Sequence, residues 1–181
     1  MIDRCFSTDI AAIRQQTRWD MRAHAATVRH GADREAVIDV LNDVLAAEVV
    51  CWLQYHQHAM CVSGIDCDQL CTEFTEHAAA ELRHAQLASA RVSQLSGGPD
   101  VDPRTLADPL PLTCPAADAA DLPAILTESL TTERIVICTY QEVIRWLGDG
   151  DATTRRMLES ILTVQERHLA GLLSLLSTVS A

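Results

Sequence analysis

Four long stretches of the sequence repeat apolar residues every three or four positions, which is the period of a helix buried along one face. Glycine-containing breaks separate them. Four amphipathic helices of this length bury their apolar faces best against one another, so the sequence predicts an all-α four-helix bundle. We expect the helices at about residues 33–62, 66–96, 121–147 and 151–178.

The connection between the second and third helices is long and rich in proline, with Pro103, Pro109, Pro111 and Pro115 within about residues 100–120. We expect neither a helix nor a tight turn there. A connection of this length can cross from one end of a bundle to the other, which gives an up-down, long-crossover, down-up topology.

A segment of about thirty residues precedes the first predicted helix, and part of it could form a shorter helix. We therefore expect an N-terminal helical extension over residues 1–32 and a bundle domain over residues 33–181.

Composition and charge exclude several functions. The net charge is −11, and all fourteen basic residues are arginines, so a nucleic-acid partner is disfavoured while cations are attracted. No apolar run reaches 18 residues, and the first ten residues do not resemble a secretory signal. Seven cysteines, an odd number partly within helical patterns, indicate mostly free thiols in a reducing cytoplasm.

An internal repeat relates the first helix to the third. LNDVLAAEVVCWLQY (Leu41–Tyr55) aligns with LTESLTTERIVICTY (Leu126–Tyr140), which places Glu48 on Glu133 and the two final tyrosines on each other. The second helix relates to the fourth in the same way, because Glu81-x-x-His84 aligns with Gln165-x-x-His168.

The repeated polar residues lie in the middle of apolar stripes, where an isolated carboxylate costs several kcal/mol unless it is paired or binds a metal. A single glutamate in such a stripe is ordinarily a partly exposed residue, and one Glu-x-x-His is common. Two matched halves with polar residues at the same depth are much rarer, and they are typical of a di-metal carboxylate site in a bundle. The candidate metal ligands are Glu48, Glu81, His84, Glu133, Gln165 and His168.

These stretches also resemble a known family. LNDVLAAEVVCWLQYHQHAM, EHAAAELRHAQ, LTTERIVICTYQEV and LTVQERHLAGLL are similar to the four helices of the bacterioferritin and Dps-like branch of the ferritin-like superfamily, over about residues 35–176. The resemblance implies that Glu48 and His84 hold one iron and that Glu133 and His168 hold the other. It also implies that Glu81 and residue 165 bridge the two ions.

The sequence departs from this family in ways that matter for the site. Gln165 stands where the family has glutamate, and an amide bridges two cations poorly. The neighbouring Glu166 points about 100° away on a helix. Leu82 replaces the methionine that ligates haem in bacterioferritins, so no haem is expected. A cysteine pairing found in the Dps-like branch would join Cys114 to a position that is Ile135 here.

Several other residues leave alternatives open. His77, one turn before Glu81, could orient a ligand, could be an extra ligand, or could be an ordinary core histidine. Tyr55 and Tyr140 could bond a ligand carboxylate, donate electrons or only pack. A disulfide or a soft-metal site is conceivable around the first turn, at Cys61, Cys67 and Cys71.

The resemblance implies a ferroxidase that oxidises Fe²⁺ with O₂ or H₂O₂, for iron storage or detoxification in a homo-oligomeric shell. We expect one or two iron ions, and Mn²⁺ or Zn²⁺ could take the place of iron. Thirteen residues follow His168, too few for the fifth helix of 24-subunit shells, so a dodecamer is expected. The alternatives are a di-metal oxidase or peroxidase, and a metal-poor structural or interaction protein, which Gln165 favours.

Overall fold

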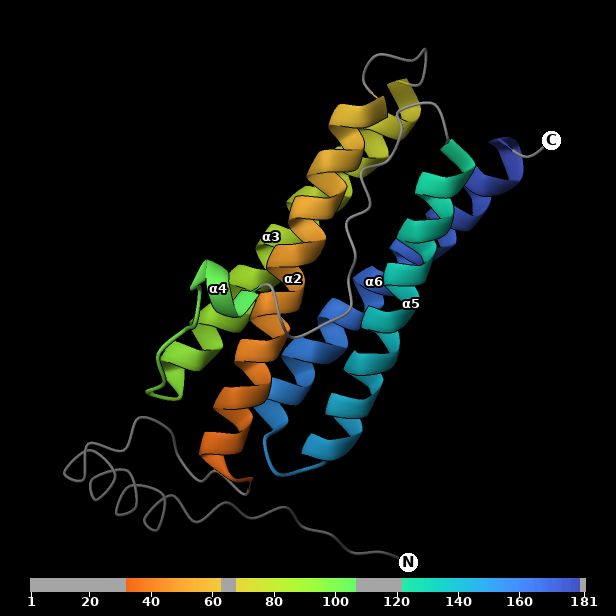
Figure 1. Ribbon diagram of the computed structural model, residues 1–181. Helices are drawn as coiled ribbons and strands as arrows, with labels where there is room; N and C mark the ends of the chain where they lie inside the picture. Colours follow the sequence, from red (N-terminus) through yellow and green to blue (C-terminus); the bar gives the residue numbers. More distant parts are fainter. Residues whose placement is uncertain (1–31, 63–67, 107–121, 180–181) are drawn as a thin grey trace, which may run out of the picture.

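The computed structural model describes residues 32–62, 68–106 and 122–179, and within them every regular element is a helix. The long helices are α2 (Arg34–Val62), α3 (Asp68–Gln94), α5 (Leu122–Leu147) and α6 (Ala152–Val179). A short helix, α4 (Pro103–Leu106), lies between α3 and α5 in the chain. The four long helices lie within two residues of their predicted bounds, and they form the predicted all-α four-helix bundle (Figure 1). The predicted N-terminal extension falls almost wholly on residues 1–31, outside the described residues.

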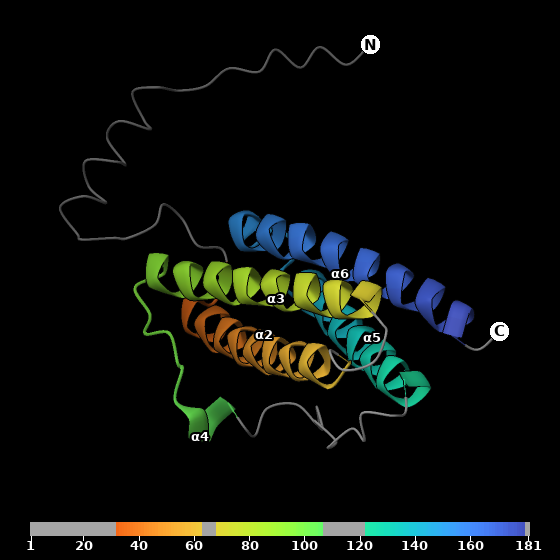
Figure 2. The ribbon, with the colours of Figure 1, turned by 90° about the horizontal axis from the view of Figure 1, so that it is seen from above.

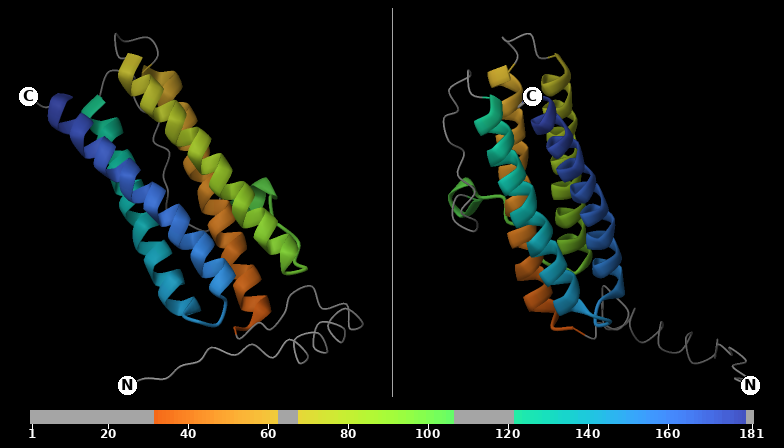
Figure 3. Two further views of the ribbon diagram at one scale, coloured as in Figure 1. Left: turned by 180° about the vertical axis from the view of Figure 1, so that it is seen from behind. Right: turned by 90° about the vertical axis from the view of Figure 1, so that its right-hand side faces the viewer.

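The bundle consists of two antiparallel helix pairs. α2 packs along α3, and α5 packs along α6; α2 then faces α5, and α3 faces α6 (Figures 2 and 3). α3 and α5 run in the same direction, so the chain between them has to return along the bundle (Figure 1). The predicted up-down, long-crossover, down-up topology is therefore confirmed.

The helix ends follow from local chemistry. Beyond the end of α3, Gly97 N–H donates to Val92 O at 2.9 Å, and a Cβ at Gly97 would lie only 2.8 Å from Ile38 of α2. Glycine is therefore needed where the chain leaves α3 against α2. At the turn between α5 and α6, Asp151 caps α6. Its carboxylate accepts hydrogen bonds from the backbone N–H groups of Thr153 and Thr154 at 3.1 and 3.0 Å.

The short helix α4 lies in the connection where no helix was expected, so that expectation was wrong for Pro103–Leu106. Proline is tolerated in the first turn of a helix because its missing N–H has no partner there anyway. Asp102 supplies the cap, since its carboxylate accepts the N–H of Arg104 at 2.9 Å.

Two apolar clusters fill the bundle. One, around Leu41, Val92 and Leu158, lies toward the start of α2, and the other, around Phe74, Leu126 and Leu172, lies toward its end. Between them lies a belt of buried polar side chains contributed by all four long helices. None of the described helices is long and apolar enough to cross a membrane.

Candidate metal centre

The six predicted ligands meet at the middle of the bundle. α2 contributes Glu48, α3 contributes Glu81 and His84, α5 contributes Glu133, and α6 contributes Gln165 and His168. Each is at most 8% exposed. The periodicity that buries the apolar stripes carries these polar residues into the core with them, because each occupies a stripe position.

The first cluster joins α2 to α3. His84 Nδ1 lies 3.3 Å from Glu48 Oε2 and 3.2 Å from Glu81 Oε2. One possible donor atom from each of the three residues lies within 4.8 Å of the others. Two carboxylates and one imidazole at this spacing could hold a divalent cation.

The second cluster reaches α5 and α6. His168 Nδ1 lies 3.2 Å from Glu81 Oε1 and 3.4 Å from Glu133 Oε1. Glu81 therefore faces one histidine with each of its two oxygens, which is the arrangement that a carboxylate shared between two ions requires.

Gln165 occupies the position that the repeat relates to Glu81. Its Nε2 donates to Glu81 Oε2 at 2.8 Å, while its Oε1 is buried without a hydrogen bond. A half-turn of the terminal torsion exchanges the two amide atoms, so Oε1 could face an ion. In the structure, however, the amide nitrogen satisfies part of Glu81.

The two repeated tyrosines bond across the bundle. Tyr55 of α2 donates its O–H to Glu133 Oε1 of α5 at 2.5 Å, and Tyr140 of α5 donates to Glu48 Oε1 of α2. Each tyrosine thus fixes one oxygen of the glutamate in the opposite half of the repeat. This confirms the hydrogen-bonding alternative for both tyrosines.

Several donor atoms in this core make no hydrogen bond of good geometry within the described residues, although those of Glu48, Glu81 and His168 take part in ion pairs at 3.2 to 3.4 Å. Buried polar atoms rarely lack a hydrogen bond, and a bound ion is one standard explanation. They belong to side chains of the two clusters and to Gln165, and all are atom types that bind metals: Glu48 Oε2, Glu81 Oε1, Glu133 Oε2, Gln165 Oε1 and His168 Nδ1.

Comparison with known proteins agrees with this architecture, because residues 38–181 match the sequence profile of the ferritin-like domain. The chain belongs to the ferritin-like family.

Individual relatives in the family are only moderately similar in sequence. A dodecameric thioferritin, the bacterioferritin-related protein from Bacteroides fragilis, is 31% identical, with a TM-score of 0.76 over 82% of this chain and 88% of that one. Bacterioferritin of Desulfovibrio desulfuricans is 28% identical over 139 residues, which are 76% of this chain and 73% of the relative.

Two further structural comparisons show the fold alone. The structure of Desulfovibrio desulfuricans bacterioferritin, whose published description names a diiron site, has a TM-score of 0.73 at 22% identity over 85% of each chain. A Dps protein from Vibrio cholerae O1 has a TM-score of 0.72 at 17% identity, over 79% of this chain and 90% of that one.

The electrostatics of this ferritin-like core favour protonated histidines when no metal is bound. Burial alone would lower the pKa of His84, but Glu48 and Glu81 outweigh it and raise that pKa to about 9. Burial likewise opposes the shift of His168, yet Glu133 and Glu81 raise its pKa to about 9.

The carboxylates are affected unequally. Burial and the charge of Glu81 raise the pKa of Glu48, and burial raises that of Glu133. For Glu81 the effect of burial is outweighed by close polar contacts with Glu48, His168 and His84, which hold its pKa below the ordinary value. The metal-free core thus balances its central carboxylate with protons on both histidines.

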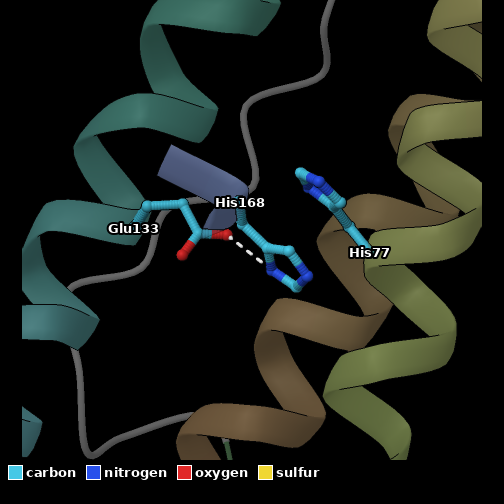
Figure 4. A group of neighbouring side chains, drawn as sticks. All are labelled: His77, Glu133 and His168. Atoms are coloured by element: carbon cyan, nitrogen blue, oxygen red, sulfur yellow. Dashed lines mark ion pairs between the residues drawn. The ribbon is translucent and has the colours of Figure 1, made fainter. Parts of the chain in front are cut away.

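His77 lies beside this ferritin-like site and is 4% exposed. Its ring stacks on that of His168, with centroids 3.9 Å apart, and meets Tyr55 edge-on at 5.0 Å. Burial and His168 lower the pKa of His77 to about 3. A donor atom of His77 lies within 4.8 Å of donors from Glu133 and His168 (Figure 4).

Sequence reasoning missed a second set of buried polar pairs further along the bundle. Ser129 Oγ lies 3.1 Å from His58 Nδ1, and Thr132 donates to Gln54 at 3.2 Å. Their sequence signal is weak, because single hydroxyl and amide residues in helices are usually exposed.

The other predicted features have mixed outcomes. The cysteines of the described residues, Cys51, Cys61, Cys71 and Cys138, are free thiols. Cys67 and Cys114 lie outside the described residues, so the site around the first turn and the crossover pairing remain untested. Leu82, at the haem-ligand position, is 38% exposed on the outside of α3.

Proposed function

We propose that this ferritin-like chain binds Fe²⁺ in the core of its bundle and oxidises it, with O₂ or H₂O₂ as oxidant, for iron storage or detoxification. The observation that carries the proposal is the convergence of buried carboxylate oxygens of three glutamates on two inward-facing histidine nitrogens, with all four long helices contributing a side chain. Carboxylates and imidazoles are ligands that suit Fe²⁺.

The geometry favours a division of the ligands between two ions. Glu48 and His84 would hold one ion, and Glu133 and His168 would hold the other. Glu81 would bridge them through its two oxygens, because each oxygen already faces a different histidine nitrogen. Gln165 would contribute its amide oxygen to the same bridge.

Surrounding residues prepare these ligands. The tyrosine hydrogen bonds hold Oε1 of Glu48 and Oε1 of Glu133. Oε2 of Glu48 faces His84 and is left for a cation, whereas Glu133 would use Oε1, which faces His168 Nδ1 at 3.4 Å. His84 and His168 must give up their Nδ1 protons when they bind. Oxidation of each Fe²⁺ to Fe³⁺ releases one electron. Two electrons and two protons reduce O₂ to H₂O₂, and a further two electrons and two protons reduce H₂O₂ to two water molecules.

We further propose that the chain forms a closed homo-oligomer of twelve subunits in the cytoplasm. The Bacteroides fragilis relative is described as dodecameric, and free thiols within the described helices fit a reducing compartment. Light scattering tests the assembly. A monomer or dimer mass would contradict storage, since no cavity could be enclosed.

One observation favours a metal-poor structural protein instead. Gln165 satisfies Glu81 with an N–H donor, so part of the bridge is closed without any ion. This alternative predicts a protein that remains metal-free after growth with iron.

Metal analysis and oxidation kinetics separate these functions. Protein purified without metal should bind Fe²⁺ anaerobically and then oxidise it when O₂ is admitted, with O₂ consumed in proportion to iron. Glu81→Ala should abolish most binding and oxidation. Glu76→Ala removes an exposed carboxylate from the same helix and should change neither. Equal iron binding by both variants would place the site elsewhere.

A further inference from the structure

The environment of His77 differs from that of an ordinary core histidine. His77 lies on α3 one turn before Glu81, so both side chains face the same part of the bundle. Figure 4 shows His77 from α3, Glu133 from α5 and His168 from α6 directed into one region between the helices.

The two nitrogens of His77 are in unlike positions. Nδ1 is buried and makes no hydrogen bond within the described residues. Nε2 lies 3.8 Å from Glu73 Oε2, a carboxylate one turn away whose side chain is 35% exposed. A metal-binding histidine commonly uses one ring nitrogen for the ion and offers the other to a carboxylate.

The distances leave little to be adjusted. Donor atoms of His77, Glu133 and His168 lie within 4.8 Å of one another. Ligands that each lie about 2.1 Å from one ion are separated by about 3 to 4 Å. Closure by about 1 Å, with one imidazole turned out of the stack so that the in-plane lone pairs of both rings face the same point, would bring the three donors onto a common ion.

A missing ligand explains why such a residue is needed. The ion held by Glu133 and His168 would have two bridging carboxylates in a symmetric site, but residue 165 is glutamine and directs its Nε2 at Glu81. This ion therefore lacks an anionic donor on its α6 side. The ion at Glu48 and His84 shares this bridge, but its cluster, Glu48, Glu81 and His84, holds no second histidine within the described residues.

We propose that His77 is an additional protein ligand of the ion at Glu133 and His168, beside the bridging Glu81. The proposal rests on the proposed function above. It makes the two positions chemically different: both share the carboxylate of Glu81, but one adds Glu48 and one imidazole, whereas the other adds Glu133 and two imidazoles. The second position should take imidazole-seeking divalent ions such as Fe²⁺, Co²⁺ or Zn²⁺ in preference to Mn²⁺.

The test compares His77→Phe with His58→Phe in the full-length protein, titrated anaerobically with Co²⁺. Phenylalanine keeps a ring against His168 and Tyr55 but removes both nitrogen donors. His58 is an equally buried histidine of α2 that bonds Ser129 and belongs to neither cluster, so its variant controls for the loss of a core imidazole.

We expect the wild type and His77→Phe each to bind two Co²⁺ per chain. In His77→Phe, but not in His58→Phe, the second ion should bind at least tenfold more weakly than in the wild type. The hyperfine-shifted NMR spectrum should also lose one exchangeable imidazole N–H signal in that variant. Adding Gln165→Glu to His77→Phe should recover the affinity for the second ion that His77→Phe loses. Thermal unfolding followed by circular dichroism checks that each variant is folded.

The outcomes distinguish this proposal from the function on which it rests. Two Co²⁺ bound with unchanged affinity in His77→Phe, and an unchanged set of N–H signals, would overturn the role of His77 and leave the di-metal site intact. A single ion that His77→Phe leaves unaltered would also overturn it. A wild-type protein that binds no ion would overturn both proposals.

Discussion

The substitution Gln165→Glu tests the charge balance of the proposed site. The wild-type set has three carboxylates, Glu48, Glu81 and Glu133, against two divalent cations. One unit of positive charge is then left uncompensated in a poorly solvated core. The new carboxylate would replace an amide whose nitrogen lies 2.8 Å from Glu81 Oε2, so it enters at the bridge itself.

The size of the effect follows from two opposing terms. Unit charges about 4 Å apart attract by about 4 kcal/mol at an effective dielectric constant of 20. Desolvation of a buried carboxylate takes back several kcal/mol even when it is paired. We expect a net gain of about 1.4 to 2.8 kcal/mol for the second ion, which is a ten- to hundredfold tighter Kd.

The metal-free variant should show the opposite effect. Without an ion, the new acid would lie against Glu81. Glu81 would also lose the hydrogen bond that it now accepts from the Gln165 amide N–H. An unsatisfied buried polar group costs about 1 to 3 kcal/mol, so metal-free Gln165→Glu should unfold about 2 kcal/mol more easily than the wild type.

Calorimetric titration with Co²⁺ or Zn²⁺, chemical unfolding with and without metal, and Fe²⁺ oxidation rates measure these effects. Gln141→Glu adds the same charge at an exposed position of α5 and should leave all three unchanged. Two equally tight ions in the wild type, unaffected by Gln165→Glu, would refute the charge argument.

Further predictions concern the bridge, the protons and the scaffold. Glu81→Ala should lose most bound metal while its circular dichroism spectrum and oligomer mass stay native, since the deletion also relieves repulsion among buried acids; full metal content would disprove the bridging role. Metal affinity should rise about tenfold per pH unit for each ion below about pH 9, because His84 and His168, with pKa values of about 9, must lose a proton to bind; proton release measured by titration in weak buffer should confirm it, and a pH-independent affinity would contradict it. The stability of the metal-free protein should have the opposite pH dependence. The folded state holds these two protons more tightly than the unfolded state, so denaturant titrations should show the free energy of unfolding falling from about pH 6.5 to about pH 9. Arg91→Ala should lower the unfolding free energy by about 3 kcal/mol, because it leaves Asp151 buried after removing two hydrogen bonds of 3.1 Å; a loss below 1 kcal/mol in urea unfolding would show that the helix cap alone satisfies Asp151.

The helices could be predicted closely because their signals are local. The apolar stripes fix which face is buried, and Gly97, Gly148 and Asp151 mark ends whose hydrogen bonds the structure shows. The short helix α4 could not be predicted from proline content alone. The Asp102 cap makes Pro103 acceptable as a first helical residue.

The convergence of the six candidate ligands could also be predicted, because the internal repeat puts matching residues at matching depth. What spacing along one helix could not give is pairing between helices. Tyr55 donates its hydrogen bond to Glu133 of α5 rather than to Glu48, which lies closer in the sequence on the same helix. The stack of His77 on His168 likewise depends on how closely α3 approaches α6, which no single-helix pattern encodes.

The central claim is that the ions bind within the bundle core, and anomalous X-ray diffraction from crystals loaded with Fe²⁺ or Co²⁺ under anaerobic conditions tests it most directly. Two anomalous peaks of unequal height are expected. The stronger should lie between Glu48, Glu81 and His84, and the weaker between Glu133 and His168, within reach of His77. Absence of any peak at these residues in crystals that contain metal elsewhere would contradict the claim.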